Sequence, residues 1–146
     1  MASPSRSKVY FFFPYDSFYL KKRNDLKKNI ETLFRKEGKR LVHINYIFST
    51  DKNLLELNKK YLFHNFYTDI LTFYISDNKK KVEAEVYISV ERVRENALNH
   101  KTTFIEELHR VIFHGALHLC GYKDKSHKEI LRMRKQENFY LSAFFK

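Results

Sequence analysis

The chain of 146 residues is long enough for one domain around a single hydrophobic core, as is typical of chains of roughly 100–200 residues. Hydrophobic residues make up 43% of it, against 3 Gly and 2 Pro, which excludes collagen-like, linker-like and low-complexity disordered proteins. Lys and Arg number 28 against 17 Asp and Glu, a formal net charge of +11 that attracts polyanions. We therefore expect nucleic acid as the partner, with a charged surface kept for solubility as the alternative.

The sequence also bears on the compartment. Its apolar runs fall far short of the roughly 20 residues that a membrane span needs, and the start MASPSRSKVYFFF lacks the long apolar core of a secretory signal. The single cysteine, Cys120, cannot form an internal disulfide. These features predict a cytoplasmic protein without a membrane partner, folded as one domain over residues 1–146 with a flexible start at residues 1–7.

Three elements are predicted in the first third of the chain. A strand over Lys8–Phe13 is ended by Pro14. A helix over Tyr19–Glu37 is predicted by apolar residues at helical spacing, namely Leu26, Ile30, Leu33 and Phe34. Alternation predicts a second strand over Arg40–Phe48, with Val42, Ile44, Tyr46 and Phe48 on one side and Leu41, His43, Asn45 and Ile47 on the other.

The rest of the chain predicts two more strands and four helices. Residues 49–51 offer N-caps to a helix that ends near Tyr61. The segments Asp69–Ser76 and Ala84–Val90 flank the polar DNKKKVE, the pattern of a hairpin or of neighbouring antiparallel strands. Helices follow over Glu91–Asn99 and Phe104–Cys120. A capping box then opens a last helix, with Ser126 and Glu129 as the box and Ile130, Met133, Glu137, Tyr140, Leu141 and Phe144 along one stripe.

Two histidines in the fourth predicted helix indicate a metal site. His114 and His118 stand four residues apart in VIFHGALHLC, which is apolar almost all round, so this helix is expected to be buried and central. Burial of two imidazoles without partners costs roughly a few kcal/mol, whereas one shared ion satisfies both; ordinary hydrogen bonds are the alternative. The predicted fold is α+β, a single domain with a four-stranded mixed sheet packed by about five helices and a buried metal-bearing central helix.

A third ligand is needed because catalytic zinc usually has three protein ligands and one open position for water. Asp124 lies six residues past His118, beyond Gly121, where a chain that turns back brings it near the helix. His127 is the alternative, and it requires the start of the last helix to swing inward. Two imidazoles and a carboxylate suit Zn²⁺, and they also fit nickel, iron or manganese.

Other residues around the two histidines have open roles. Cys120 is turned away from both rings by its helical offset, as expected of a core thiol. Arg110 and Glu107 lie four and seven residues before His114, so they either face the site or form a solvated ion pair. Position 115 is Gly, so the general base of HExxH peptidases is missing, and another backbone or a substrate can approach the helix closely.

The run HGALHLCGYKD (residues 114–124) resembles the HGxLHLxGYDH signature of the YbeY family, bacterial metal-dependent endoribonucleases of ribosomal RNA maturation. The resemblance extends upstream: Leu57, Asn58 and Tyr61 are similar to the family's LNxxY segment, TDILTF (residues 68–73) to TDVLSF, and AEVYIS (residues 84–89) to GDIxIS. It covers most of the chain from about residue 40 to residue 124 and agrees with the family's α+β fold.

The resemblance implies roles for some residues and leaves others unassigned. It carries His114 and His118 over as zinc ligands, while Asp124 replaces the family's third histidine by position and by plausible chemistry. An arginine that family members often have after LNxxY is Leu62 here, so His64, Arg110 or a lysine would have to supply that cation. No acid is placed beside the histidines by spacing; Asp69 and Glu85, in the family-like strands, are only guesses at a general base.

The function implied by the resemblance is a zinc-dependent endoribonuclease that cuts single-stranded rRNA. It would act in maturation of the 16S 3′ end and in ribosome quality control, in contact with the small subunit or its associated factors. Exposed aromatic residues at Phe63, Phe66 or Tyr67 would stack unpaired bases, although each is equally suited to a core. Two alternatives are a non-catalytic, metal-stabilised RNA-binding or ribosome-binding factor, with His127 closing the metal site, and a zinc peptidase or other hydrolase, for which the helix provides no base.

Overall fold

The computed structural model describes residues 7–15, 18–76, 78 and 80–146. The predicted flexible start lies outside the described residues, except for Ser7. Within them the chain forms a four-stranded sheet in the order β1-β2-β4-β3. β1 pairs with β2 and β2 with β4 in parallel, whereas β3 and β4 are antiparallel. The predicted mixed sheet is confirmed, with strand bounds β1 (Val9–Phe12), β2 (Arg40–Ser49), β3 (Ile70–Tyr74) and β4 (Lys81–Ser89).

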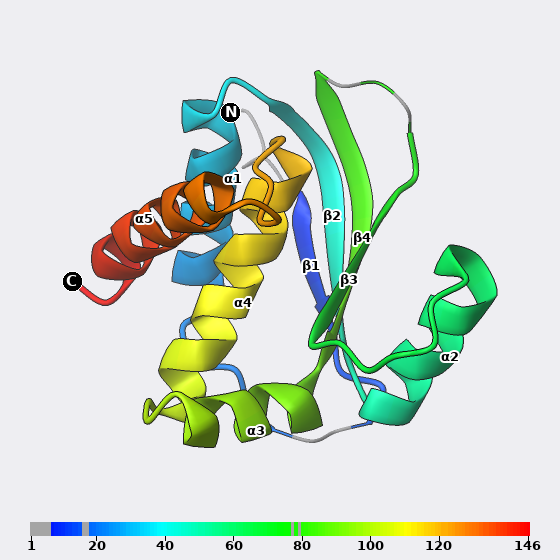
Figure 1. Ribbon diagram of the computed structural model, residues 1–146. Coiled ribbons are helices and arrows are strands. Elements are labelled where there is room, and N and C mark those ends of the chain that lie inside the picture. The colour runs from blue at the N-terminus through cyan, green and yellow to red at the C-terminus, as the bar shows by residue number, and fades with distance from the viewer. Residues whose placement is uncertain (1–6, 16–17, 77, 79) are drawn as a thin grey trace.

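Five helices pack around this sheet in the described part of the chain. Figure 1 shows α1, α4 and α5 together on one face, α3 across one end and α2 on the other side of the sheet. The first helix begins four residues later than its spacing predicts, at Arg23, after Lys22 in a left-handed conformation with φ 55°. The bounds are α1 (Arg23–Lys36), α2 (Asp51–Leu62), α3 (Val90–Asn99), α4 (Phe104–Leu119) and α5 (His127–Phe144). No helix among the described residues is long and apolar enough to cross a membrane.

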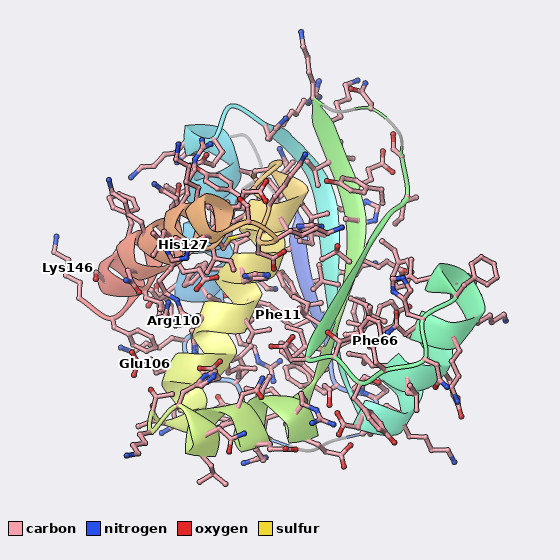
Figure 2. The ribbon with its side chains drawn as sticks, viewed as in Figure 1. Phe11, Phe66, Glu106, Arg110, His127 and Lys146 are labelled. Carbon is pink, nitrogen blue, oxygen red and sulfur yellow. The ribbon has the colours of Figure 1, made fainter. Side chains whose placement is uncertain are left out.

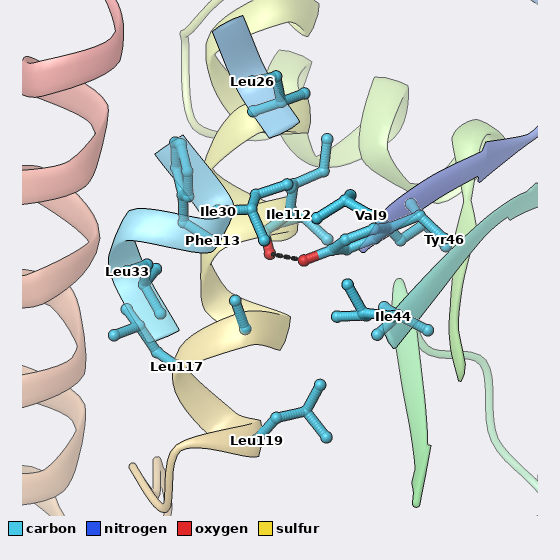
Figure 3. Close-up of a cluster of buried hydrophobic side chains, with 14 of the residues drawn as sticks. Val9, Leu26, Ile30, Leu33, Ile44, Tyr46, Ile112, Phe113, Leu117 and Leu119 are labelled. Atoms are coloured by element: carbon cyan, nitrogen blue, oxygen red, sulfur yellow. Dashed lines mark hydrogen bonds between the residues drawn. The ribbon is translucent and has the colours of Figure 1, made fainter. Parts of the chain in front are cut away.

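The core lies between the sheet and α4, as the apolar circumference of this helix predicts. Fully buried side chains from β1, β2, α1 and α4 meet there, and Figure 3 shows them around Tyr46. The Tyr46 hydroxyl donates a hydrogen bond of 3.1 Å to the Ile112 carbonyl in α4. Burial raises the pKa of this hydroxyl far above its usual range, so it stays protonated as a donor. The bond fixes α4 against the middle of β2.

One side assignment in β2 is wrong. Simple alternation puts Val42 on the side of Ile44, but Leu41 is buried and Val42 is exposed. The cause is an irregularity in the pairing of β2 with β4 between Leu41 and His43, where one extra residue shifts the alternation. From Ile44 to Phe48 the predicted alternation is confirmed, and Ile44, Tyr46 and Phe48 are the buried side.

The glycine of α4 marks a close contact with the sheet. A Cβ placed on Gly115 would lie 2.8 Å from Ile70 Cδ1 and 3.3 Å from Val86 Cγ1. The close approach that this glycine predicts is therefore made by side chains of β3 and β4, not by a backbone or a substrate. It holds the histidine-bearing helix directly over these two strands.

Candidate active site

A cleft of about 280 Å³ lies where α4 and α5 meet the end of α3 and the chain entering β3. Figure 2 shows Arg110 on the face of α4 that is turned toward α5, at the edge of this region. The polar residues that line the cleft include Asp69, Asn96, Arg110, His114, Asp124 and Glu137. Segments that are distant in sequence thus bring four carboxyl groups, two imidazoles and two guanidiniums to one place, since Glu107, His100 and Arg134 also line the cleft.

His114 lies between two carboxylates. Its Nδ1 is 2.7 Å from Glu137 Oε2, and its Nε2 is 3.3 Å from Asp124 Oδ2. Burial lowers the pKa of His114, but the bond to Glu137 and the negative charges of Glu137, Asp124 and Asp69 outweigh it, so the net shift is upward. The carboxylates around the imidazole therefore stabilise its protonated form more than burial destabilises it.

Glu137 is only 4% exposed and anchors the site from α5. Its second oxygen accepts a 3.0 Å bond from the Arg110 guanidinium. Burial alone raises the pKa of Glu137, but the hydrogen bonds from His114 and Arg110 and the positive charges of His114 and Arg134 outweigh it and lower the pKa overall. The ionised carboxylate therefore orients both side chains, and the interpretation in which Arg110 faces the site is correct.

His118 stands one turn further along α4, and its side chain is exposed. Its Nδ1 lies 3.2 Å from the Tyr122 carbonyl, which leaves Nε2 as the donor atom for a ligand. Among the residues that the structure describes, His118 does not line the cleft, and no three His, Cys, Asp or Glu side chains are gathered into a metal-holding group. Of the three predicted ligands, His114 and Asp124 are brought together.

The donor set nevertheless fits a metal ion. Histidines that bind metals almost always hold one ring nitrogen against a carboxylate or backbone carbonyl and present the other. His114 does so with Glu137, His118 does so with the Tyr122 carbonyl, and Asp124 lies at the presented nitrogen of His114. The alternative ligand His127 begins α5 and, within the described residues, is not part of the cleft lining.

Asp69, one of the two acids that the sequence suggests as a general base, adds a further carboxylate to the cleft from just before β3. Asn96 Nδ2 donates a 3.3 Å bond to Asp69 Oδ2. Burial raises the pKa of Asp69, an effect that the positive charge of His114 partly offsets. Glu85, the other guess, alternates with the inward residues Ala84 and Val86 of β4 and pairs with the Tyr87 hydroxyl at 3.4 Å, so it belongs to the opposite face of the sheet.

Two further sequence candidates lie near the cleft without joining its chemistry. Glu107 is buried in the lining and meets His100 Nδ1 at 3.6 Å. Cys120 is half-buried, packs against the core from the end of α4 and lines a separate pocket with Glu37. Burial raises the pKa of this thiol to about 12, so it is a neutral packing group, as its helical offset predicts.

Sequence reasoning missed the roles of Glu137 and Asn96. Glu137 has a recognisable signal, since it is a charged residue within the apolar stripe of the last helix, a position that is buried only when the charge has partners. Asn96 gives no such signal, because its partner Asp69 is 27 residues away and only the packing of α3 beside β3 brings them together.

The site and fold match a known family. The family described as endoribonuclease YbeY matches residues 17–144. A protein of this name from Cytophaga hutchinsonii is 43% identical over 138 residues, covering 94% of this chain and 96% of its own length. Another from Amoebophilus asiaticus is 38% identical over 138 residues, 94% of each chain. A Thermotoga maritima protein of known solution structure superposes with a TM-score of 0.63 at 28% identity, covering 94% of this chain and 89% of that one. The chain belongs to the endoribonuclease YbeY family.

Proposed function

We propose that this protein is a metal-dependent endoribonuclease that hydrolyses phosphodiester bonds in single-stranded ribosomal RNA. The observation that carries the proposal is the arrangement at His114, whose Nδ1 is held by Glu137 while Asp124 lies 3.3 Å from its Nε2. His114, His118 and Asp124 are the proposed ligands of one Zn²⁺ ion, and nickel, iron or manganese suits the same donors. His118 would turn its free Nε2 toward the ion.

The substrate is proposed from the relatives and from the charge. The relatives at 43% and 38% identity are named endoribonucleases, so RNA is their substrate class. A net charge of +11 provides the field that collects a polyanionic strand. The specific role that we propose, by family resemblance of the HGALHLCGYKD segment, is maturation of the 16S 3′ end and ribosome quality control. The partner would be the small ribosomal subunit or its associated factors, in the cytoplasm.

Asp69 is the residue of this chain that we assign to proton transfer. A bound metal ion supplies a water of lowered pKa or polarises the scissile phosphate. Burial raises the pKa of Asp69 and so makes its carboxylate a stronger base, and Asn96 fixes the orientation of that carboxylate, so Asp69 is suited to take a proton from the attacking water. Substitution Asp69→Asn is expected to slow RNA cleavage about 10²–10⁴-fold without loss of the metal.

The phosphate-contacting cation is assigned to Arg134. The position of the family arginine is Leu62, and the guanidinium of Arg110 is bound to Glu137 at 3.0 Å. Arg134 also lines the cleft, but its side chain is 54% exposed and lies 3.9 Å from Glu137, a loose contact that a phosphate can replace. This guanidinium can therefore reach a strand that enters the cleft.

The test combines metal content with cleavage of a single-stranded RNA fragment that carries the 16S 3′-end sequence. His118→Ala and Asp124→Ala are compared with His127→Ala, a histidine outside the cleft. We expect about one metal equivalent in the wild type and in His127→Ala, and loss of both metal and cleavage in the other two. If Asp124→Ala retains the metal and His127→Ala loses it, His127 and not Asp124 is the third ligand. Metal and RNA bound without cleavage would favour the non-catalytic factor.

A further inference from the structure

The loop that joins α2 to β3 exposes aromatic rings at the surface. Within this aromatic loop, residues 63–67, the side chain of Phe63 is 88% exposed and those of Phe66 and Tyr67 are each 55% exposed. Three large apolar rings within five residues form a surface that ordinary packing does not explain, and such exposed patches typically mark interaction sites. The structure thus places these rings at the surface, whereas the sequence suited a core position equally well.

Hydrogen bonds to Asn58 of α2 hold the aromatic loop in place. Phe63 ends α2 in the left-handed conformation, with φ 57°, and its backbone N–H bonds to the Asn58 carbonyl. A bulky aromatic residue rarely adopts this conformation, because its Cβ crowds the backbone. Asn58 is only 1% exposed, and its side-chain amide donates a 3.0 Å bond to the Phe66 carbonyl. The buried asparagine therefore ties both ends of the exposed segment to the helix.

The rings are also aligned before any ligand arrives. His64 and Phe66 stack with centroids 5.1 Å apart and planes 23° apart. The Arg92 guanidinium lies 5.1 Å from the centre of the Tyr67 ring and is itself fixed by a 2.9 Å ion pair with Asp51. A stacked pair and a ring backed by a cation present flat faces at little further cost in conformational entropy.

The aromatic loop leads directly into the cleft. Only Thr68 separates Tyr67 from Asp69, so the Cα atoms of Tyr67 and Asp69 are at most about 7 Å apart along the chain. Figure 2 shows Phe66 between α2 and β3, on the other side of β3 from Arg110. A strand whose phosphate lies at Asp69 would therefore pass its next nucleotides over the loop.

The charges around the loop identify the occupant. Lys59 and Lys60 lie in the last turn of α2, immediately before the exposed rings, and Arg92 lies beneath Tyr67. Flat aromatic faces interleaved with cations match an unpaired base on a phosphate backbone. We propose that the aromatic loop is a base-stacking subsite of the RNA, in which Phe66 and Phe63 bind unpaired bases of the strand that leaves the cleft past Asp69. This inference rests on the proposed nuclease function and assigns its strand preference to this loop.

The experiment measures binding of an unstructured RNA oligonucleotide in EDTA, where cleavage does not interfere, with 2-aminopurine as the stacking probe. Phe66→Ala and Phe63→Ala are compared with Phe139→Ala, which removes a similarly exposed phenyl ring on α5. We expect binding about 5- to 150-fold weaker for each loop variant, with unchanged salt dependence, and reduced quenching of the probe. Phe66→Tyr keeps a ring and should restore binding, and an oligonucleotide with abasic sites should make Phe66→Ala equal to the wild type.

Four outcomes would overturn the inference. If the loop variants bind RNA as tightly as Phe139→Ala does, the aromatic loop is not a base-stacking subsite. Normal RNA cleavage by the wild type in the same preparation would still support the nuclease function. An equal loss on normal and abasic RNA would mean that the rings do not contact bases. A change of oligomeric state in Phe66→Ala, measured by analytical ultracentrifugation, would assign the loop to a contact between protein chains. If the wild type neither binds nor cuts RNA, the proposed function fails as well.

Discussion

At the scale of single residues, Glu137 has an unusual position. It occupies a place in the buried stripe of α5, where helical spacing otherwise puts Met133, Tyr140 and Leu141. A carboxylate that is 4% exposed is tolerated there because His114 and Arg110 both bind it. The buried stripe of α5 therefore packs against the core and also, through Glu137, orients His114 of the neighbouring helix.

This position leads to a prediction about metal affinity. Glu137→Gln keeps the shape of the side chain but removes the charge that holds His114 and Arg110. We expect Zn²⁺ affinity to fall about 10- to 100-fold, the usual effect of losing a carboxylate behind a metal-binding histidine. Competition with a zinc-sensitive dye measures it, with the exposed Glu95→Gln as control. Equal zinc affinity in both variants would mean that Glu137 does not support a ligand.

His109 is a second buried polar residue, and it is remote from the proposed chemistry. Its ring is stacked on Phe144 at 4.8 Å and meets the edge of Phe145, while its Nδ1 bonds to the Ile105 carbonyl. Its Nε2 is buried without a hydrogen-bond partner among the described residues. Burial lowers the pKa of His109 below its ordinary value of 6.5, and the bond to Ile105 offsets only part of that shift.

The lowered pKa predicts a pH dependence of stability. Below about pH 6.5 the unfolded chain binds a proton at His109, whereas the folded chain keeps this imidazole neutral. The contribution of neutral His109 to the free energy of unfolding is therefore complete above pH 6.5 and is lost as the pH falls toward the folded-state pKa. We expect His109→Phe to lose less stability than the wild type between about pH 7.5 and about pH 5.5 in urea unfolding. An identical loss in both proteins would contradict a neutral His109.

At the scale of secondary-structure elements, the contact between α4 and β3 sets the position of the histidines. Gly115 has no side chain, so Ile70 and Val86 can lie against the helix backbone. The same contact places the chain that precedes β3, with Asp69, beside His114 on α4. The glycine of the HGALH run therefore serves the site through element packing.

A double substitution tests this contact. Gly115→Ala gains about 1 kcal/mol of helix propensity but puts a Cβ 2.8 Å from Ile70 Cδ1, and such overpacking costs about 1–3 kcal/mol. We expect net destabilisation of about 0–2 kcal/mol. In an Ile70→Val background, where Cδ1 is absent, the alanine should be neutral or stabilising. A double-mutant cycle of unfolding free energies measures the coupling, and a value near zero would contradict the close contact.

At the scale of the whole molecule, the positive charge predicts how RNA binding responds to salt. Each phosphate neutralised on a single strand contributes a slope of about −0.7 to the dependence of log K on log salt. With a net charge of +11, we expect a steep dependence from several such contacts. Fluorescence anisotropy over a range of KCl concentrations measures the slope. Binding insensitive to salt would mean that phosphates are not the main contact.

The same Arg134 that we assign to a phosphate should appear in this slope. Arg134→Gln is expected to reduce the magnitude of the slope by about 0.7, the contribution of one phosphate. The aromatic-loop variants, which remove no charge, should leave it unchanged. The two classes of contact are thus separated by one measurement on the intact protein. An unchanged slope in Arg134→Gln would remove this residue from the phosphate contacts.

The sequence predicted the elements well where the periodicity was strong. The last helix, its capping box at Ser126 and Glu129, and the antiparallel pairing of β3 with β4 all follow the local patterns. β4 begins at Lys81, three residues before the predicted start at Ala84, because residues assigned to the polar turn pair with β2. Two other errors fall where local patterns carry no information: the pairing irregularity that turns Val42 outward, and the left-handed Lys22 that delays α1. Both depend on how a segment meets its neighbours.

For the site, the sequence by itself determined the chemical types and one geometric relation, the helical spacing of His114 and His118. Tertiary structure alone decided the rest, because a hydrogen bond between residues 23 or 27 positions apart depends on how helices pack. It placed Glu137 behind His114 and Asn96 against Asp69, and it turned Glu85 to the opposite face of the sheet. It also decided that Phe63, Phe66 and Tyr67 face water, since aromatic residues in a loop suit a core and a surface equally until the neighbouring elements take their places.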